Sequence, residues 1–227
     1  MTGRFSPQTL DHVALWVTER EALSALLCDH LGMHVIEKTD SFTLVGVDAK
    51  LGKLTLFDAD GPRSRAPAER VVLRVRDLEA AVGRLPGEVE RVAEGVVFDA
   101  SDGLRLGLVE ADGVDFDLHH VVLRLPDPER AASELAAMGF ERRNGHVAVA
   151  DRYVRLLEGR PDDGGRPLLN HLAVLVESAR DVQERAPERG FEIDDVKDAP
   201  NTFAVFLRGP AGVRIEYVEH KPGFALS

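Results

Sequence analysis

The sequence predicts an α+β fold made of four copies of one module, each with the order strand, helix and three further strands (βαβββ), paired into two domains. Apolar strands recur at residues 11–17, 70–76, 119–125 and 170–176. Their matched positions, 12, 70, 120 and 171, are 58, 50 and 51 residues apart. Self-similarity at such a period is the signature of repeated structural units. An amphipathic segment follows each opening strand, and an apolar strand that ends in an acid closes each module.

The second element of each module has the pattern of an amphipathic helix. The four segments span residues 19–33, 77–85, 127–140 and 178–191. Residues that favour N-caps begin three of them, and glycines that favour helix ends stop three of them: Asp77, Asp127 and Ser178, and Gly32, Gly139 and Gly190. We therefore expect one helix per module, packed on one face of its sheet.

The closing strands span residues 53–58, 104–110, 153–158 and 213–219. Aligned on their last apolar–acidic pair, they place four residues at one structural position: Thr55, Gly107, Arg155 and Glu216. Alternate residues of a strand share a face. The face of the third opening strand that carries Val121 is apolar and should meet the helix. The face that carries His120 should then line the concave side of the sheet, as should those that carry His171 and Glu216.

Polar linkers indicate how the modules are grouped. Segments 58–69 and 158–169 are rich in glycine, proline and charge, and a shorter segment at 111–117 lies between the halves of the chain. We predict an N-terminal domain at 1–112, with modules 9–58 and 69–110. A C-terminal domain at 113–227 would hold modules 117–158 and 169–219.

The composition excludes several classes of protein. The 227 residues are 44% hydrophobic and 30% charged, which is typical of a globular protein. The net charge is −11 and the basic residues are scattered, which argues against binding to nucleic acid or to an anionic membrane. The single Cys28, the absence of a long apolar run and the polar N-terminus predict a cytoplasmic location.

The second half of the chain carries a candidate metal site formed by His120, His171 and Glu216. Two imidazoles and one carboxylate with open positions suit Fe(II), or alternatively Mn(II). A lone histidine at a strand start is usually structural, but these two occupy matched positions of the repeat. The first half offers only His12 at such a position, so we expect it to hold no metal.

Further residues are candidates for catalysis. His146 shares a face with small residues, so it either lines the cavity as an acid or base or lies at the surface after a turn. Arg155 occupies the fourth corner of the site, where it would hold an anionic substrate oxygen or pair with Glu216. His119 is assigned to the opposite face, as a packing or capping residue.

These features resemble the vicinal oxygen chelate superfamily, which contains glyoxalase I, extradiol dioxygenases and bleomycin-resistance proteins. The four-module layout is most similar to the two-domain extradiol dioxygenases, and the stretch RGPAGVRIEYVE resembles their closing hairpin. The resemblance implies a metal-free N-terminal domain and ligands at His120, His171 and Glu216. The sequence departs from that family where Tyr153 replaces a histidine and Phe206 a tyrosine.

The resemblance implies an extradiol-type ring-cleavage dioxygenase that takes O₂ and a catechol or similar vicinal diol, with His146 or Tyr153 handling protons. One alternative keeps the metal without O₂, as an isomerase, lyase or hydrolase. Another is a resistance-type protein that sequesters a ligand. We expect a small-molecule partner, no nucleic acid and no membrane, and leave homo-oligomerisation open.

Overall fold

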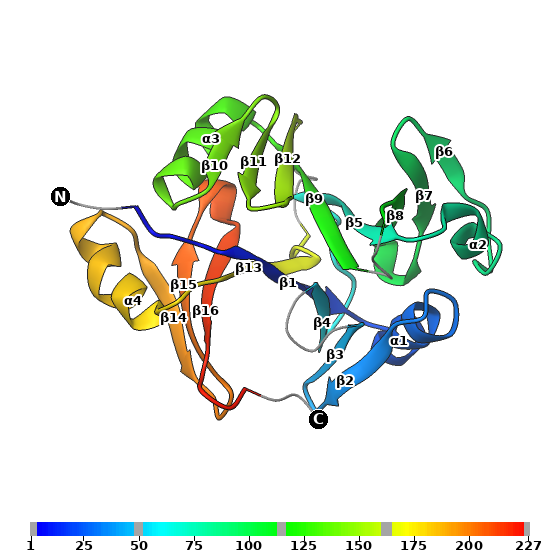
Figure 1. Cartoon of the computed structure of the whole chain (residues 1–227), viewed down its shortest axis with the longest axis horizontal. Helices are drawn as coiled ribbons and strands as arrows, with labels where there is room; N and C mark the ends of the chain where they lie inside the picture. The colour runs from blue at the N-terminus through cyan, green and yellow to red at the C-terminus, as the bar shows by residue number, and fades with distance from the viewer. Residues whose placement is uncertain (1–3, 48–51, 113–116, 160–164, 225–227) are drawn as a thin grey trace.

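Each repeat folds in the predicted order in the computed structural model, which describes residues 4–47, 52–112, 117–159 and 165–224 (Figure 1). The first module comprises β1 (Thr9–Val17), α1 (Arg20–Asp29), β2 (His34–Lys38), β3 (Phe42–Gly46) and β4 (Lys53–Asp58). The second comprises β5 (Ala68–Val75), α2 (Leu78–Val82), β6 (Glu90–Val92), β7 (Gly95–Asp99), the 3₁₀ turn η1 (Ser101–Gly103) and β8 (Arg105–Glu110).

The third and fourth modules repeat this order. The third comprises β9 (Asp117–Leu125), α3 (Pro128–Ala137), β10 (Glu141–Arg143), β11 (His146–Val149) and β12 (Arg152–Glu158). The fourth comprises β13 (Leu169–Leu175), α4 (Ala179–Glu188), β14 (Ile193–Asp198), β15 (Thr202–Arg208), the turn η2 (Pro210–Gly212) and β16 (Arg214–His220).

The helix boundaries follow the capping residues in the sequence. The side chains of Asp77, Asp127 and Ser178 each accept a hydrogen bond from a backbone N–H in the first turn of the next helix. At the opposite ends, Gly32 and Gly190 have φ of 77°, a left-handed conformation that glycine adopts without a Cβ clash. The predicted helix signals at these positions are confirmed.

The modules pair differently from the prediction. One eight-stranded sheet has the order β14-β15-β16-β13-β1-β4-β3-β2 and combines modules one and four (the 1/4 sheet). The other has the order β10-β11-β12-β9-β5-β8-β7-β6 and combines modules two and three (the 2/3 sheet). The α+β fold and its four modules are confirmed, but the halves 1–112 and 113–227 do not each form their own sheet.

The connections between modules account for this pairing. The short link after β8 leads directly into β9, which pairs antiparallel with β5 in the same sheet. The two longer links, after β4 and after β12, each join one sheet to the other, and their described parts meet. Ser64 of one link forms a parallel bridge with Pro167 of the other, and its N–H donates to the Arg166 carbonyl oxygen at 2.8 Å. The long links therefore connect sheets, and the short link joins neighbours within one sheet.

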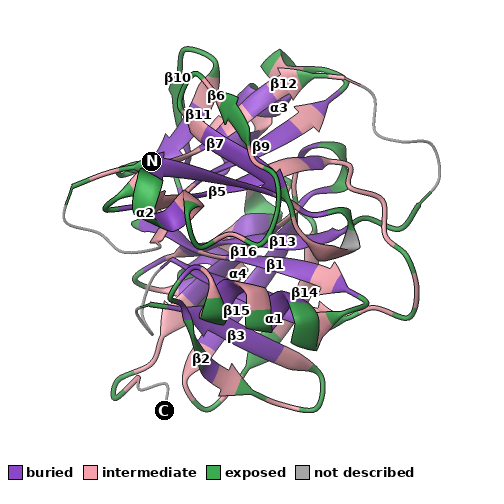
Figure 2. Ribbon diagram, turned by 90° about the vertical axis from the view of Figure 1, so that its right-hand side faces the viewer, coloured by how far each residue is buried: buried purple, intermediate pink, exposed green. Residues whose placement is uncertain are grey.

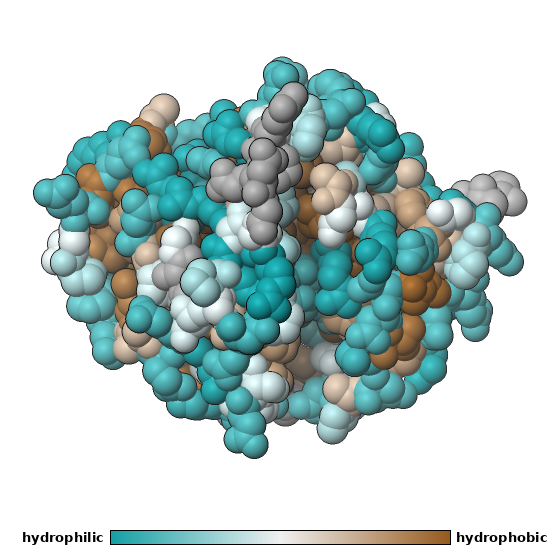
Figure 3. Space-filling view, turned by 180° about the vertical axis from the view of Figure 1, so that it is seen from behind, coloured by the Kyte–Doolittle hydropathy of each residue, from teal (hydrophilic) through white to brown (hydrophobic). Residues whose placement is uncertain are grey.

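A continuous apolar core fills the space between the helices and the sheets (Figure 2). It includes Leu15 and Leu54 of module one, Leu106 of module two, Leu123 of module three and Ile215 of module four, all fully buried. Among the described residues, no helix has the length and apolar composition to cross a bilayer. The face in Figure 3 is mostly hydrophilic, and its hydrophobic groups lie in separate areas.

Two buried polar contacts tie the sheets to each other. The Tyr217 hydroxyl in β16 donates to the Met138 carbonyl oxygen after α3 at 2.6 Å. The Arg152 guanidinium in β12 donates to the Thr9 hydroxyl in β1 and to the Leu118 carbonyl oxygen. The Tyr217–Met138 and Arg152–Thr9 contacts each join the 1/4 sheet to the module pair of the 2/3 sheet, so they fix how the two sheets dock.

The Tyr217 contact predicts a defined loss of stability. Tyr217→Phe would leave a buried carbonyl oxygen without its donor, so the free energy of unfolding should fall by about 1–3 kcal/mol. Urea unfolding followed by circular dichroism measures the change. Tyr153→Phe is the matched control, because Tyr153 is partly exposed and its hydroxyl has no hydrogen bond among the described residues. Equal losses in both variants would contradict this role of Tyr217.

Candidate metal centre

Three potential ligands meet where β1 and β13 join at the middle of the 1/4 sheet. The Nε2 atoms of His12 and His171 lie 3.0 Å apart. Glu216 Oε2, from β16, lies 2.8 Å from His171 Nε2 and 3.1 Å from His12 Nε2. The three atoms form a nearly equilateral triangle. Three adjacent ligands of an octahedral ion at about 2.1 Å would have the same separation, about 3 Å.

The strand register explains how the imidazoles reach each other. His12 lies opposite Ala173, and His171 lies opposite Ala14, in the antiparallel pairing of β1 with β13. The two small alanines are fully buried and leave room for each ring to extend diagonally across the seam. Glu216 lies beside Ala173 on the neighbouring strand.

A β-bulge next to each histidine supplies a partner for its other ring nitrogen. Asp11 and Asn170 are the extra residues of the two bulges, so each points toward the same face as the histidine that follows it. Asp11 Oδ1 lies 2.7 Å from His12 Nδ1, and Asn170 Oδ1 lies 3.0 Å from His171 Nδ1. Because both oxygens are acceptors, Nδ1 carries the proton and the lone pair on Nε2 faces the centre.

The charge balance of this group fits a cation. Glu216 is buried, and its Oε2 has no properly oriented hydrogen bond within the described chain. Burial opposes ionisation of Glu216, but the two histidines hold its pKa below its usual range. Burial also disfavours charge on His12, but Glu216 and Asp11 raise its pKa to about 9. When no ion is bound, a second proton on His12, at Nε2, offsets the carboxylate, and a divalent cation would replace that proton.

The fourth position around the triangle is Thr55 in β4, next to Ala14. Its hydroxyl is a weak ligand compared with an imidazole or a carboxylate. Thr55 lines a cavity of about 330 Å³ that also contacts His12, Glu216 and the phenyl rings of Phe42 and Phe57. The side of the centre that faces this cavity therefore keeps open coordination positions.

Asp11 is the hub of a buried polar network beside the centre. Besides His12, its carboxylate lies 2.9 Å from Lys53 Nζ and 3.0 Å from His220 Nε2. Asp11 is 1% exposed. Burial raises the pKa of Asp11, but the contacts with His12, His220 and Lys53 lower it by more. The net pKa lies below the usual range, so the carboxyl stays ionised. Asp11 thereby orients a ligand on one side and a cavity-lining imidazole on the other.

The predicted ligand His120 belongs to the other sheet, and the structure brings His12 to His171 and Glu216 in its place. His171 and Glu216 are brought together as predicted, but β9, which carries His120, pairs with β5 and β12. The clustered residues within the described chain are His12, His171 and Glu216. The error came from pairing module four with module three, where the structure pairs it with module one.

The other predicted site residues also lie on the 2/3 sheet. Tyr153 stacks on His120 with ring centroids 4.3 Å apart, and His146 packs against Tyr153 at 4.7 Å. Arg155 Nη1 lies 3.5 Å from Glu94 and does not approach Glu216. His119 is a bulge residue, so its Nδ1 lies 3.0 Å from His120 Nδ1 and the predicted opposite-face placement is wrong.

Sequence reasoning did not assign Asp11, Lys53 and His220 to the site. The sequence did contain a signal for Asp11. Asp11-His12 and Asn170-His171 are both pairs of a hydrogen-bond acceptor followed by a histidine, at matched positions of the repeat. Lys53 and His220 lie at the start of β4 and the end of β16 and meet Asp11 only through strand pairing.

The buried His120 predicts a pH effect on stability. Burial, followed by the positive charges of His119 and Arg70, lowers the pKa of His120 to about 3. Arg155 and His146 add to this effect. The pKa of an unfolded histidine is about 6.5. Between pH 6.5 and pH 3 the unfolded state therefore binds more protons at His120 than the folded state does. The free energy of unfolding should fall as the pH is lowered through this range.

The matched variant is His120→Phe, which keeps the ring stack on Tyr153 without a titrating group. Between pH 6 and 4 the wild type should lose up to about 1.4 kcal/mol per pH unit more than the variant. Urea unfolding at each pH measures the slope. Parallel pH profiles for the two proteins would show that His120 is protonated in the fold and that the prediction is wrong.

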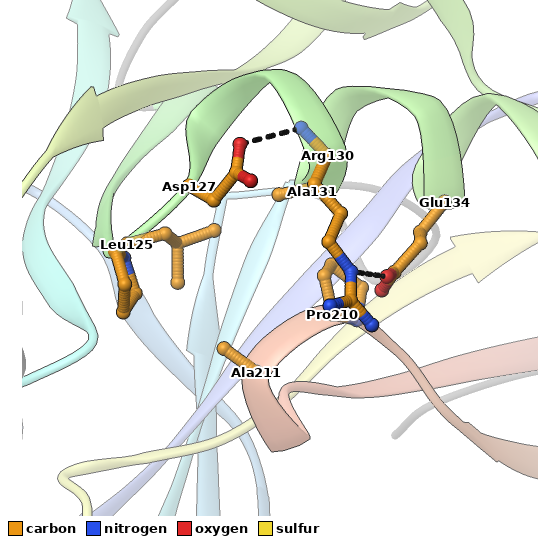
Figure 4. A pocket seen from close by; sticks show the side chains of 8 residues that line it. Leu125, Asp127, Arg130, Ala131, Glu134, Pro210 and Ala211 are labelled. Atoms are coloured by element: carbon orange, nitrogen blue, oxygen red, sulfur yellow. Dashed lines mark hydrogen bonds and ion pairs between the residues drawn. The ribbon is translucent and has the colours of Figure 1, made fainter.

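A second cavity, of about 250 Å³, lies between the start of α3 and η2 (Figure 4). Its polar groups are already paired, because Asp127 accepts from the Arg130 backbone N–H and Arg130 Nε donates to Glu134. No set of metal-ligating atoms converges on it among the described residues. The centre in the 1/4 sheet is therefore the stronger candidate site.

Comparisons with known proteins agree with the fold. No curated protein matches the chain. A Bacillus subtilis protein provisionally named a dioxygenase has a TM-score of 0.77 at 19% identity, covering 97% of this chain and 87% of that one. Glyoxalase I from Zea mays has a TM-score of 0.72 at 15% identity, covering 93% and 92%. The cppA protein from Streptococcus pneumoniae has a TM-score of 0.66 at 15% identity, covering 93% and 98%.

At these identities the structures establish a shared fold only. The sequence itself carries the family signal, since the profile of the Glyoxalase/Bleomycin resistance protein/Dioxygenase superfamily matches residues 9–156. This match covers well over half of the chain, including β1 with His12. The chain belongs to the Glyoxalase/Bleomycin resistance protein/Dioxygenase superfamily.

Proposed function

We propose that the chain is a metalloenzyme whose centre binds Fe(II), or alternatively Mn(II), through His12, His171 and Glu216. The observation that carries this proposal is the convergence of two Nε2 lone pairs and one carboxylate oxygen within 3.1 Å of one another. Two histidines and one carboxylate with open positions are the ligand set of non-haem ferrous oxygenases. Thr55 in the fourth position leaves about three coordination positions for substrate and O₂.

The reaction we propose is extradiol-type cleavage of a catechol or a similar vicinal diol. The bound ion would lower the pKa of the diol and hold it beside O₂. With His12, His171 and Glu216 holding the ion, the side that faces the cavity would be left for the substrate. Phe42 and Phe57 pack with ring centroids 5.7 Å apart along the cavity, and Phe206 packs edge-on against His171 at 5.1 Å. These apolar rings would hold a planar aromatic substrate and exclude water.

His220 replaces His146 and Tyr153 as the proposed proton acceptor, because it lines the cavity beside Glu216. Its Nε2 lies 3.0 Å from the ionised Asp11, so Nε2 carries a proton and Nδ1 is left as a base. Phe224 stacks on the imidazole with ring centroids 3.9 Å apart and fixes its plane. The metal centre together with His220 would also serve an O₂-independent isomerase or lyase, in which His220 removes a proton next to a carbonyl.

A reducing cytoplasm remains part of the proposal. The single Cys28 forms no disulfide within the chain, and a reducing compartment would keep the ion in the ferrous state.

Metal content tests the ligand set. Protein purified without O₂ and loaded with Fe(II) should bind one equivalent, and His12→Ala or Glu216→Ala should abolish that stoichiometric binding, because each removes one of three ligands. His120→Ala is the matched control, since it removes the histidine at the corresponding position of the 2/3 sheet and should bind metal like the wild type. Equal loss in His120→Ala would contradict the site, and a metal-free wild type with an intact fold would favour ligand sequestration.

Activity tests the reaction and the base. The ferrous protein should consume O₂ with catechols, and His220→Gln should lower kcat by about 10²–10⁴-fold while metal content is unchanged. Turnover of hydroxycarbonyl compounds under nitrogen, without O₂ uptake on catechols, would replace the dioxygenase with the isomerase or lyase. Full activity in His220→Gln would remove His220 from the mechanism.

A further inference from the structure

The 2/3 sheet repeats the architecture of the metal centre with a different set of residues. Its seam, between β5 and β9, has bulges at Glu69 and His119, which match Asp11 and Asn170 of the other seam. The four positions that surround the centre in the 1/4 sheet, His12, Thr55, His171 and Glu216, correspond here to Arg70, Gly107, His120 and Arg155. Two guanidinium groups therefore replace one imidazole and one carboxylate.

His120 is buried in this second group with an unused polar atom. It is 1% exposed, and its Nε2 has no hydrogen-bond partner among the described residues. Its other nitrogen faces His119 Nδ1 at 3.0 Å. Whichever Nδ1 atom donates in this contact, His120 Nε2 is left as a buried polar atom without a partner among the described residues. A buried polar nitrogen of this kind is costly unless a ligand forms a hydrogen bond with it.

The positive charge around His120 is not neutralised. Arg70 is half-buried and forms no ion pair or hydrogen bond with the described part of the chain. Within the described chain, Arg155 is paired only with the exposed Glu94, at 3.5 Å. Nearby arginines of the same sheet are paired closely, as in the 2.6 Å contact of Arg152 with Asp117. Of the two arginines, only Arg155 thus has a carboxylate partner within the described chain, and that contact is long, in a protein whose net charge is −11.

We propose that Arg70, Arg155 and His120 form a binding site for a small oxyanion, a carboxylate or a phosphate group, separate from the metal centre. The guanidinium groups would supply charge-assisted hydrogen bonds, and His120 Nε2–H would donate to a further oxygen of the anion. Arg70 and Arg155 are both partly exposed, so their guanidinium groups are open to solvent, while Tyr153 covers His120. Glu94 occupies part of the site until the anion displaces it.

Calorimetric titration of the metal-loaded protein with inorganic phosphate and with benzoate tests the site. At least one anion should bind with a stoichiometry of one, and the one that binds identifies the ligand as a phosphate or a carboxylate. Arg70→Gln and Arg155→Gln should each weaken binding by about tenfold or more, because each removes a hydrogen bond to a charged group. Arg91→Gln is the charge-matched control, since Arg91 is exposed and paired with Glu79, and it should bind like the wild type.

Two further variants separate this site from simple charge effects and from the metal centre. Glu94→Gln removes the competing carboxylate at an exposed position and should strengthen binding severalfold. Glu216→Ala alters the metal centre and should leave anion binding unchanged. The proposal is overturned if neither anion binds at about 10 mM, if Arg91→Gln weakens binding as much as Arg70→Gln, or if binding is lost in Glu216→Ala. Melting followed by circular dichroism shows that each variant is folded.

Discussion

The antiparallel seam between β1 and β13 is the constraint on which the candidate centre depends. It joins the first strand of the chain to a strand more than 150 residues later, since His12 and His171 are 159 positions apart. The register puts an alanine opposite each histidine, and the two bulges turn Asp11 and Asn170 toward their neighbours. A shift of the register by one residue would move the imidazoles to the helix-packed face and disperse all three ligands.

The environment of the seam sets the protonation states that a metal requires. Asp11 and Asn170 accept from the two Nδ1 atoms, so both Nε2 lone pairs point inward. Lys53 neutralises the buried Asp11 carboxylate, which would otherwise be costly at 1% exposure, and His220 Nε2 lies 3.0 Å from the same carboxylate. One network therefore orients a ligand, balances a buried charge and presents an imidazole to the cavity.

The repeat uses the same backbone geometry twice with opposite charge. In the 1/4 sheet, Glu216 beside two imidazoles creates a site for a cation. In the 2/3 sheet, the arginines at the positions of His12 and Glu216 disfavour a cation. The alanines opposite the histidines of the first seam are also replaced by valines, with Val122 opposite Arg70 and Val72 opposite His120. The bulges persist in both seams, which indicates that they belong to the module pairing itself. The side chains beside them then give the two seams opposite charge.

The sequence alone determined the four modules, their helix caps and the equivalence of positions such as Thr55 and Glu216, because these features depend on local periodicity and capping. It also singled out His171 and Glu216. It did not determine that module four pairs with module one. The prediction therefore named His120 where the structure has His12 beside His171 and Glu216. Strand periodicity shows which face a residue occupies but not which strand lies beside it. That choice rests on contacts between distant segments, namely the packing of both seams and the two long links that cross together at Ser64 and Pro167. The bulges were likewise set by tertiary pairing, because an extra residue in a strand exists only relative to its partner.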